Sequence, residues 1–137
     1  MQKIILTSLL LALSSCATVQ IPISEAVPVA SSRIYVPSLV SATANATFVR
    51  DPGFAGSICT FAIYVGSIKV FSIRPGEKLG LSLPLGTHVL KLESPESPTN
   101  PCALSTKYLT STFEAGSAQV FRIHIDGTPS LQFARIE

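Results

Sequence analysis

The sequence predicts an all-β fold, a small antiparallel β-sandwich of seven to nine strands, on the strength of three observations. Apolar and polar residues alternate with a period of two through most of the chain after residue 33, which is typical of strands with one buried face. Glycine and proline turns separate these runs at short intervals. No run after residue 33 shows an apolar stripe at helical spacing. A small β-barrel is the alternative fold.

The chain begins with a segment organised like a signal peptide. Lys3 supplies a positive charge, and Ile4 to Leu13 form a run of apolar and small residues. This run is shorter than the roughly 20 apolar residues that a membrane helix requires. Residues 1–15 are therefore expected to be removed and take no part in the fold. An ordinary secretory signal, cut near Ser15 or Ala17, is the alternative.

The apolar run ends in Leu13-Ser14-Ser15-Cys16. This stretch resembles the lipobox of bacterial lipoproteins, a resemblance that implies a lipid on the Cys16 thiol and cleavage just before it. Ala17 rather than aspartate follows the cysteine, and the sorting rule of such lipoproteins then implies the outer membrane, with the domain facing the periplasm. Several acyl chains on one residue make a durable anchor.

The three cysteines of the chain fit this interpretation. If Cys16 carries lipid, Cys59 and Cys102 remain as an even pair in an oxidising compartment. A disulfide between Cys59 and Cys102 is therefore expected, and it would stabilise the domain by about 4 kcal/mol in the chain-entropy model.

Two further regions follow the signal segment. Residues 16–32 are expected to form a flexible tether behind the lipidated cysteine, because they contain Pro22 and Pro28 and show no sustained period. An edge strand at Val19 to Ile23 is compatible with these prolines, whereas a central strand is not. Residues 33–137 are expected to form one β-sandwich domain, long enough to bury about 65% of the surface of its unfolded chain.

Five runs alternate clearly enough to assign the residues that share a face. These are Cys59, Phe61, Ile63 and Val65; Leu79, Leu81 and Leu83; His88, Leu90 and Leu92; Phe121, Ile123 and Ile125; and Leu131 and Phe133. The turns expected between strands are Gly66-Ser67, Pro75-Gly76, Pro84-Leu85-Gly86, Gly116-Ser117 and Asp126-Gly127.

The stretch from Tyr64 to Leu92 carries a second resemblance. Its order of turns and strands is similar to the small PEGA-type sandwich modules of bacterial envelope proteins, and Pro84, Gly86 and His88, followed by Leu90, match their last hairpin. Gly66-Ser67 stands where such modules often have Asp-Gly. The resemblance implies a fold and no particular activity.

The composition offers little for catalysis or for binding nucleic acid. The chain has ten Lys and Arg against eight Asp and Glu, and loss of Lys3 leaves nine, so no basic field for nucleic acid is expected. His88 and His124 lie on different predicted strands, without the short-spaced pairs typical of zinc sites. We expect His88 to cap a strand edge or a turn and His124 to face solvent. A metal site joining them with Glu93 or Asp126 is the alternative.

The sequence also lacks the motifs typical of nucleophilic and acid–base catalysis. No GxSxG motif occurs, and Gly56-Ser57 is expected to be a turn. Glu93 and Glu96 are the nearest carboxylate pair, and both are expected to be solvated beside a proline-rich loop. The loop of "RPGEKLG" joins strands and opens no helix, so it does not predict phosphate binding. We expect no catalytic residue, no metal and no cofactor.

Binding is harder to exclude from the sequence than catalysis. Tyr35, Tyr64 and Tyr108 are expected to be scattered, which does not favour a stacking platform for sugars, and the loop from Glu93 to Pro101 is expected to be the most exposed. The favoured interpretation of this loop is a variable connection without a partner. The pattern favours a non-enzymatic structural or adaptor component of the bacterial envelope with an envelope protein as partner. The alternatives are a periplasmic inhibitor of a cell-wall hydrolase such as lysozyme, which would use Ser94 to Ser97, and a module that binds a small ligand.

Overall fold

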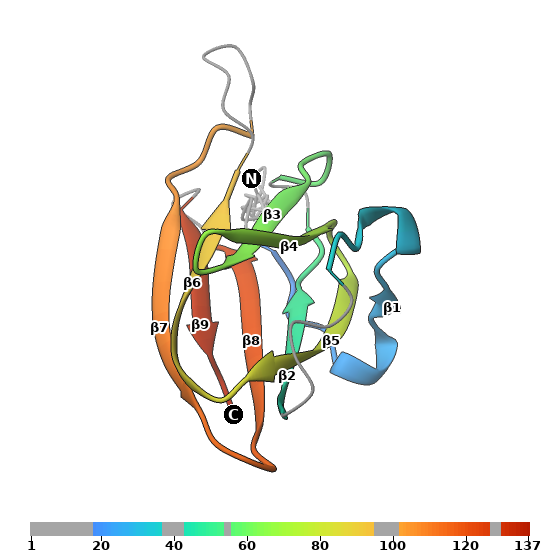
Figure 1. The fold of residues 1–137 in the computed structure, drawn as a ribbon. Helices are drawn as coiled ribbons and strands as arrows, with labels where there is room; N and C mark the ends of the chain where they lie inside the picture. Colours follow the sequence, from blue (N-terminus) through green and yellow to red (C-terminus); the bar gives the residue numbers. More distant parts are fainter. Residues whose placement is uncertain (1–17, 37–42, 54–55, 95–101, 127–129) are drawn as a thin grey trace, which may run out of the picture.

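A computed structural model describes residues 18–36, 43–53, 56–94, 102–126 and 130–137 (Figure 1). In this part of the chain nine strands form two sheets, so the prediction of a β-sandwich is confirmed. The strands are β1 (Val27–Pro28), β2 (Thr43–Arg50), β3 (Phe61–Val65), β4 (Ile68–Ile73), β5 (Glu77–Pro84), β6 (Gly86–Glu93), β7 (Lys107–Phe113), β8 (Ala118–Ile125) and β9 (Leu131–Arg135). Two short 3-10 helices, η1 (Ile23–Glu25) and η2 (Ser31–Arg33), flank β1, and none of the described helices is long and apolar enough to cross a membrane.

The strands divide into a five-stranded and a four-stranded sheet. The first has the order β1-β5-β2-β8-β9 and the second the order β4-β3-β6-β7. Most neighbours are antiparallel, as expected, but β1 runs parallel to β5 and β2 runs parallel to β8. The expectation of a purely antiparallel fold is wrong for these two contacts. Alternation reveals the two faces of a strand but not the direction of its neighbour.

The core lies between the inner faces of the two sheets. Phe48 of β2 and Phe121 of β8 stack with their ring centroids 5.1 Å apart, and Phe71 of β4 meets Phe48 edge-on at 5.2 Å. Phe113 of β7 lies 6.0 Å from Phe121. Because β4 and β7 are strands of the second sheet, these rings join the two sheets into one core. The shared faces predicted for β3, β5, β6, β8 and β9 all turn toward it.

The described turns fall where glycine and proline predicted them, and Gly66, Gly76, Gly86 and Gly116 all have positive φ. Gly56 is more constrained, because it combines a φ of +67° with close packing. A Cβ atom at this position would lie 2.6 Å from Cδ1 of Ile125. Glycine is therefore required here both for its backbone conformation and for the space that it leaves.

The described part of the segment expected as a tether packs against the domain instead of standing free of it. We call residues 18–36 the N-terminal strap. It begins with a bridge between Thr18 and Gly53 and continues as β1 along the edge of β5. It ends with Ile34 bridged to Phe71 of β4. The strap thus covers an edge strand of each sheet, and edges of this kind otherwise expose unpaired backbone groups. The edge strand is Val27–Pro28 rather than the Val19 to Ile23 considered from the sequence.

Three side-chain contacts hold the strap against the sheets. Arg33 of the strap forms a bidentate ion pair with Glu77, whose Oε2 lies 2.7 Å from Nη1. Lys78 Nζ donates to the Ile23 carbonyl at 2.7 Å, and Arg122 Nη1 donates to the Ile21 carbonyl at 3.1 Å. Hydrogen bonds from charged side chains to backbone carbonyls produce no periodic pattern of apolar residues. The sequence therefore predicts a free segment here, although such bonds hold it in place.

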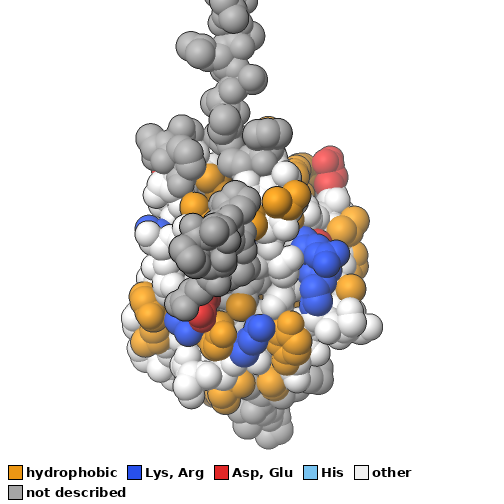
Figure 2. Space-filling model, turned by 90° about the horizontal axis from the view of Figure 1, so that it is seen from above, with side chains coloured by type: hydrophobic (Ala, Val, Ile, Leu, Met, Phe, Trp, Pro, Cys, Tyr) orange, Lys and Arg blue, Asp and Glu red, His pale blue; other side chains and the backbone are white. Residues whose placement is uncertain are grey.

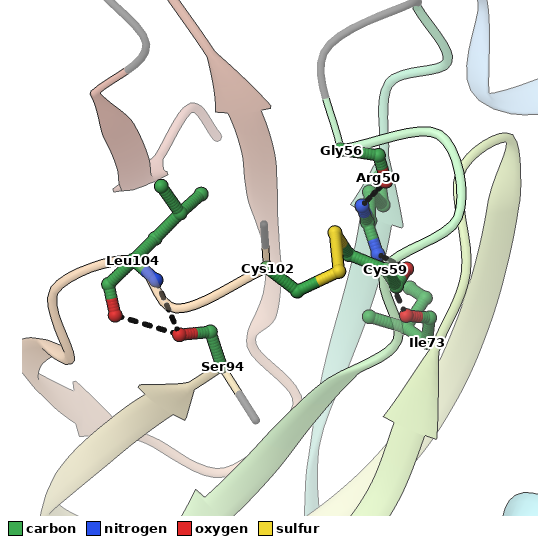
Figure 3. The surroundings of a disulfide bond; sticks show 7 residues. All are labelled: Arg50, Gly56, Cys59, Ile73, Ser94, Cys102 and Leu104. Carbon is green, nitrogen blue, oxygen red and sulfur yellow. Dashed lines mark hydrogen bonds between the residues drawn. A yellow bond between two sulfur atoms is a disulfide. The ribbon is translucent and has the colours of Figure 1, made fainter. Parts of the chain in front are cut away.

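The disulfide joins the loop after β2 to the loop before β7. Cys59 and Cys102 are both buried, with their sulfur atoms 2.06 Å apart, so the predicted pair is confirmed (Figure 3). β2, β6 and β8 finish at this end of the sandwich, which we call the disulfide end. Ser94 pins the same region, because its hydroxyl donates to the Leu104 carbonyl at 2.6 Å and accepts from the Leu104 amide at 2.8 Å.

A fully buried arginine supports the disulfide end. Arg50, only 2% exposed, donates to the carbonyls of Cys59 at 2.6 Å, Gly56 at 2.8 Å and Ile73 at 3.0 Å (Figure 3). Its guanidinium carbon lies 3.9 Å from the ring centroid of Phe61. Burial lowers the pKa of Arg50 to about 10. This role could not be predicted from the sequence, because an arginine at the end of a strand is ordinarily exposed.

Candidate binding face

The three tyrosines of the chain lie together on the outer face of the four-stranded sheet. Tyr64 of β3 pairs with Lys69 of β4 on one side and with Lys91 of β6 on the other. Lys91 pairs in turn with Tyr108 of β7. Tyr35 of the strap lies over Lys69 at the other end of this series. We call these five side chains the tyrosine–lysine row. The expectation that the tyrosines are scattered is wrong, because strand pairing brings together residues far apart in the sequence.

Lysine and aromatic side chains contact one another along the row. Lys91 Nζ lies 3.8 Å from the ring centroid of Tyr64, and Lys69 Nζ lies 4.8 Å from that of Tyr35. Both distances are within the roughly 6 Å over which a cation is attracted to an aromatic face. Tyr35 is held further by its backbone amide, which donates to Val70, and by a 3.2 Å hydrogen bond between its hydroxyl and Ser72. These contacts order the row before any partner arrives.

The row is accessible and carries a net positive charge. Tyr108 is 68% exposed and Tyr35 48% exposed. Glu93, two residues after Lys91 on β6, forms an ion pair with it, with Oε2 of Glu93 2.8 Å from Nζ of Lys91. This contact lowers the pKa of Glu93 and raises the pKa of Lys91, so both remain charged at neutral pH. One carboxylate therefore faces two ammonium groups, because Lys69 also belongs to the row.

A hollow of about 380 Å³ adjoins the row on the same face of the sheet. Its lining residues combine hydroxyl, aromatic, amine and carboxylate groups: Thr60, Ala62, Tyr64, Lys69, Ser72, Glu93 and Ser94. These groups can donate and accept hydrogen bonds and can stack against a planar or saccharide-like surface. The arrangement is suited to recognition of a surface or a polar ligand.

The two histidines do not meet. His88 lies on β6 of the four-stranded sheet and His124 on β8 of the five-stranded sheet. His88 Nε2 hydrogen-bonds with the Pro84 carbonyl at 3.0 Å across the β5–β6 turn, so the expectation that His88 caps a turn is confirmed. His124 is half-buried rather than solvent-facing, because it lies beneath the strap beside Asp51 and Arg122. Among the described residues no group of three or more His, Cys, Asp or Glu side chains is placed to hold a metal.

The other sequence candidates are placed as follows. Ser94, the described end of the stretch considered for a hydrolase inhibitor, is buried and bonded to Leu104. Glu96, Ser97 and most of the loop expected to be exposed lie outside the described residues, as does Cys16. Glu93, expected to be solvated beside a loop, is half-buried and forms an ion pair with Lys91 of the tyrosine–lysine row.

A second hollow, of about 360 Å³, lies between the strap and the outer face of the five-stranded sheet. Thr18, Gln20, Asp51, Arg122 and His124 contribute to its lining. Asp51 and Arg122 form a buried ion pair there, and Asp51 Oδ1 also accepts from the Ile21 amide at 3.2 Å. The pair thus secures the strap, which is a structural role.

Comparison of the chain with family models, with curated proteins and with solved structures finds no match. The geometry of the described residues is therefore the basis for the proposals that follow.

Proposed function

We propose that the protein is a non-enzymatic lipoprotein of the bacterial outer membrane, anchored through Cys16 and facing the periplasm, which acts as an adaptor by binding another envelope protein. The observation that supports this role is the convergence of all three tyrosines on one exposed sheet face. The membrane location rests on the sequence before and after Cys16.

Tyrosine is well suited to such a contact. Its ring buries a large apolar area while its hydroxyl keeps a hydrogen bond, and tyrosine is enriched at the centres of protein interfaces. Lys69 and Lys91 pack along the rings of Tyr35 and Tyr64 and so supply both area and charge. A typical partner would cover about 800 Å² on each side.

The charge of the face favours a partner with acidic groups around an apolar centre. Glu93 balances Lys91, whereas Lys69 contacts the ring of Tyr35 and adds a second positive charge. Charges at the rim of an interface mainly determine the choice of partner and the association rate. We therefore expect binding that weakens as the salt concentration rises.

One observation favours a second candidate, the binding of a small polar ligand. The hollow beside Tyr64 offers the hydroxyls of Thr60 and Ser72 together with the Glu93 carboxylate. A saccharide or short peptide would find stacking and hydrogen bonds there. The hydrolase-inhibitor alternative is less supported, since Ser94 is buried and its hydroxyl is engaged with Leu104.

The test is affinity isolation of the protein from its own envelope after mild cross-linking. Three forms are compared: the unchanged protein, a Tyr64→Ala/Tyr108→Ala variant, and a Val27→Ala variant whose exposed side chain lies on the strap, away from the row. The adaptor role predicts one protein recovered in a fixed ratio with the unchanged and Val27→Ala forms, and at least about tenfold less with the double variant. Equal recovery from all three forms, or recovery of nothing specific, would contradict it.

Anchoring is tested separately by the mass of the N-terminal peptide. Acylation predicts a peptide that begins at Cys16 and carries acyl groups, and a Cys16→Ala form without them. A peptide that begins elsewhere, with a free thiol at Cys16, would refute the lipoprotein assignment.

A further inference from the structure

The strap leaves almost no free chain between the sandwich and the proposed lipid. Thr18 is already fixed, because its amide donates to the Ile125 carbonyl at 2.9 Å and its hydroxyl accepts from the Ile125 amide at 3.1 Å. Only Ala17 separates Thr18 from Cys16 in the sequence. Two residues span at most about 7 Å. A tether of the length expected from the sequence would instead have reached roughly 50 Å.

The start of the strap is held by more than one contact. The Val19 amide donates to the Pro52 carbonyl at 2.7 Å, and Thr18 is bridged to Gly53. A few residues further on, Ile21 is bonded to both members of the Asp51–Arg122 ion pair. Release of the strap would break all of these bonds together. The lipid on Cys16 would therefore hold the folded domain directly at the membrane, with no flexible linker between them.

The place at which the strap begins also defines which part of the domain lies nearest the lipid. Thr18 contacts Ile125 at the finish of β8, and Gly56 approaches the same Ile125 side chain. Gly56 begins the turn that leads to the disulfide, and Ile58 lies in that turn. The disulfide end is consequently the membrane-proximal end.

The surface chemistry of this end fits a lipid headgroup region. Ile58 is 80% exposed, more than any other large hydrophobic residue in the described part of the chain, and Val19 beside Thr18 is 66% exposed. Figure 2 views the molecule from this side and shows hydrophobic and uncharged surface over most of the area described, with charged side chains in a few separate groups. An exposed isoleucine is costly in water and is favourable at the boundary between headgroups and acyl chains.

We infer that the disulfide end of the sandwich rests on the membrane surface, with Ile58 inserted among the lipid headgroups, so that the strap is a rigid mount. This inference rests on the proposed lipidation of Cys16. The inference also determines how close the binding face lies to the membrane. Lys91 lies two residues before the last residue of β6, and Tyr108 is the second residue of β7. Both strand termini are at the disulfide end. The tyrosine–lysine row is then held close to the bilayer, within reach of a partner at the same membrane.

The absence of tryptophan from the sequence allows a direct test. Ile58→Trp places a single tryptophan at the disulfide end, and Leu85→Trp places one at the β5–β6 turn at the opposite end, where Leu85 is 42% exposed. Each full-length lipidated protein is isolated from its own membranes and reconstituted into phosphatidylcholine vesicles that contain lipids brominated on the acyl chains near the headgroup. Bromine quenches only tryptophans that reach the bilayer.

The inference predicts blue-shifted emission for Ile58→Trp and quenching at least about threefold stronger than for Leu85→Trp. A flexible insertion of about ten Gly and Ser residues between Ala17 and Thr18 provides the matched control, since it allows the domain to move roughly 15–20 Å away. With the insertion, quenching of Ile58→Trp should fall toward the Leu85→Trp value.

The possible failures can be told apart. If the acylated Ile58→Trp and Leu85→Trp variants are quenched equally, or if the insertion does not change the quenching of Ile58→Trp, the rigid mount is refuted and the lipoprotein assignment stands. A protein without acyl groups by mass would overturn both. Circular dichroism of each variant establishes that the sandwich is intact.

Discussion

Arg50 offers the sharpest stability test, because it is a buried charge that contacts no carboxylate among the described residues and must be supported by other groups. We consider Arg50→Met, which keeps an unbranched side chain of useful length but removes the guanidinium. The three carbonyls of Gly56, Cys59 and Ile73 would lose their donor, and the contact with the Phe61 ring would lose its cation.

Two opposing terms set the magnitude. Hydrogen bonds from a charged group contribute about 1.5–3 kcal/mol each, so the three bonds together contribute roughly 5–9 kcal/mol. Burial lowers the pKa of Arg50 from 12.5 to about 10, which corresponds to a desolvation cost of about 3 kcal/mol that methionine avoids. The difference predicts a loss of about 2–6 kcal/mol in the free energy of unfolding, close to the range usual for breaking a buried charged network.

The assay is equilibrium unfolding in urea, followed by far-ultraviolet circular dichroism on the unlipidated Cys16→Ala background. Arg135→Met is the matched control, since Arg135 is exposed on β9 and its loss changes the net charge equally. The control should change the free energy of unfolding by no more than about 0.5 kcal/mol. If Arg50→Met costs no more than the control, the three hydrogen bonds are not the support that the geometry indicates.

Three further outcomes are expected. Replacing both Cys59 and Cys102 by alanine should cost about 4 kcal/mol in urea unfolding, given a separation of 43 residues, and an unchanged midpoint would refute the stabilising role of the bridge. Burial raises the pKa of Glu77, but its hydrogen bonds and the charge of Arg33 outweigh this, and the pKa lies below 4.5. The stability from this pair is therefore complete above about pH 5 and is lost as the pH falls through the folded-state pKa, so Glu77→Gln should flatten the acid side of the stability profile; identical profiles would contradict the pair's role. Tyr108→Ala should change stability by less than about 0.5 kcal/mol yet weaken partner binding about tenfold, as measured by calorimetry and surface plasmon resonance, and unchanged binding would count against the face.

The parts of the fold that could be predicted are those governed by local sequence. Alternation assigned the inner face of β3 correctly, and Pro75-Gly76 and Gly86 marked turns that the structure contains. β2 escaped the pattern because its inward-facing positions are not uniformly apolar and large: Ala44 and Ala46 are small, and Arg50, on the same face as Phe48, is charged.

The binding face could not be predicted, for a related reason. Tyr64, Lys91 and Tyr108 are neighbours only because β3, β6 and β7 pair in one particular register, which a single sequence does not specify. The spacing of the three tyrosines in the sequence does not indicate that they are neighbours either, because Tyr35 joins the row from the strap and not from a strand of this sheet. The cysteine count did predict the disulfide, because a covalent pair depends on parity and compartment rather than on register.

The adaptor role is the central claim, and site-specific photo-cross-linking in the native envelope tests it most directly. A photoreactive phenylalanine analogue is placed at Tyr108, in the row, or at Val27, which is similarly exposed on the strap. The account predicts that illumination joins the Tyr108 form, and not the Val27 form, to one envelope protein. An absence of any adduct from Tyr108, or the same adducts from both positions, would contradict the claim that this face binds the partner.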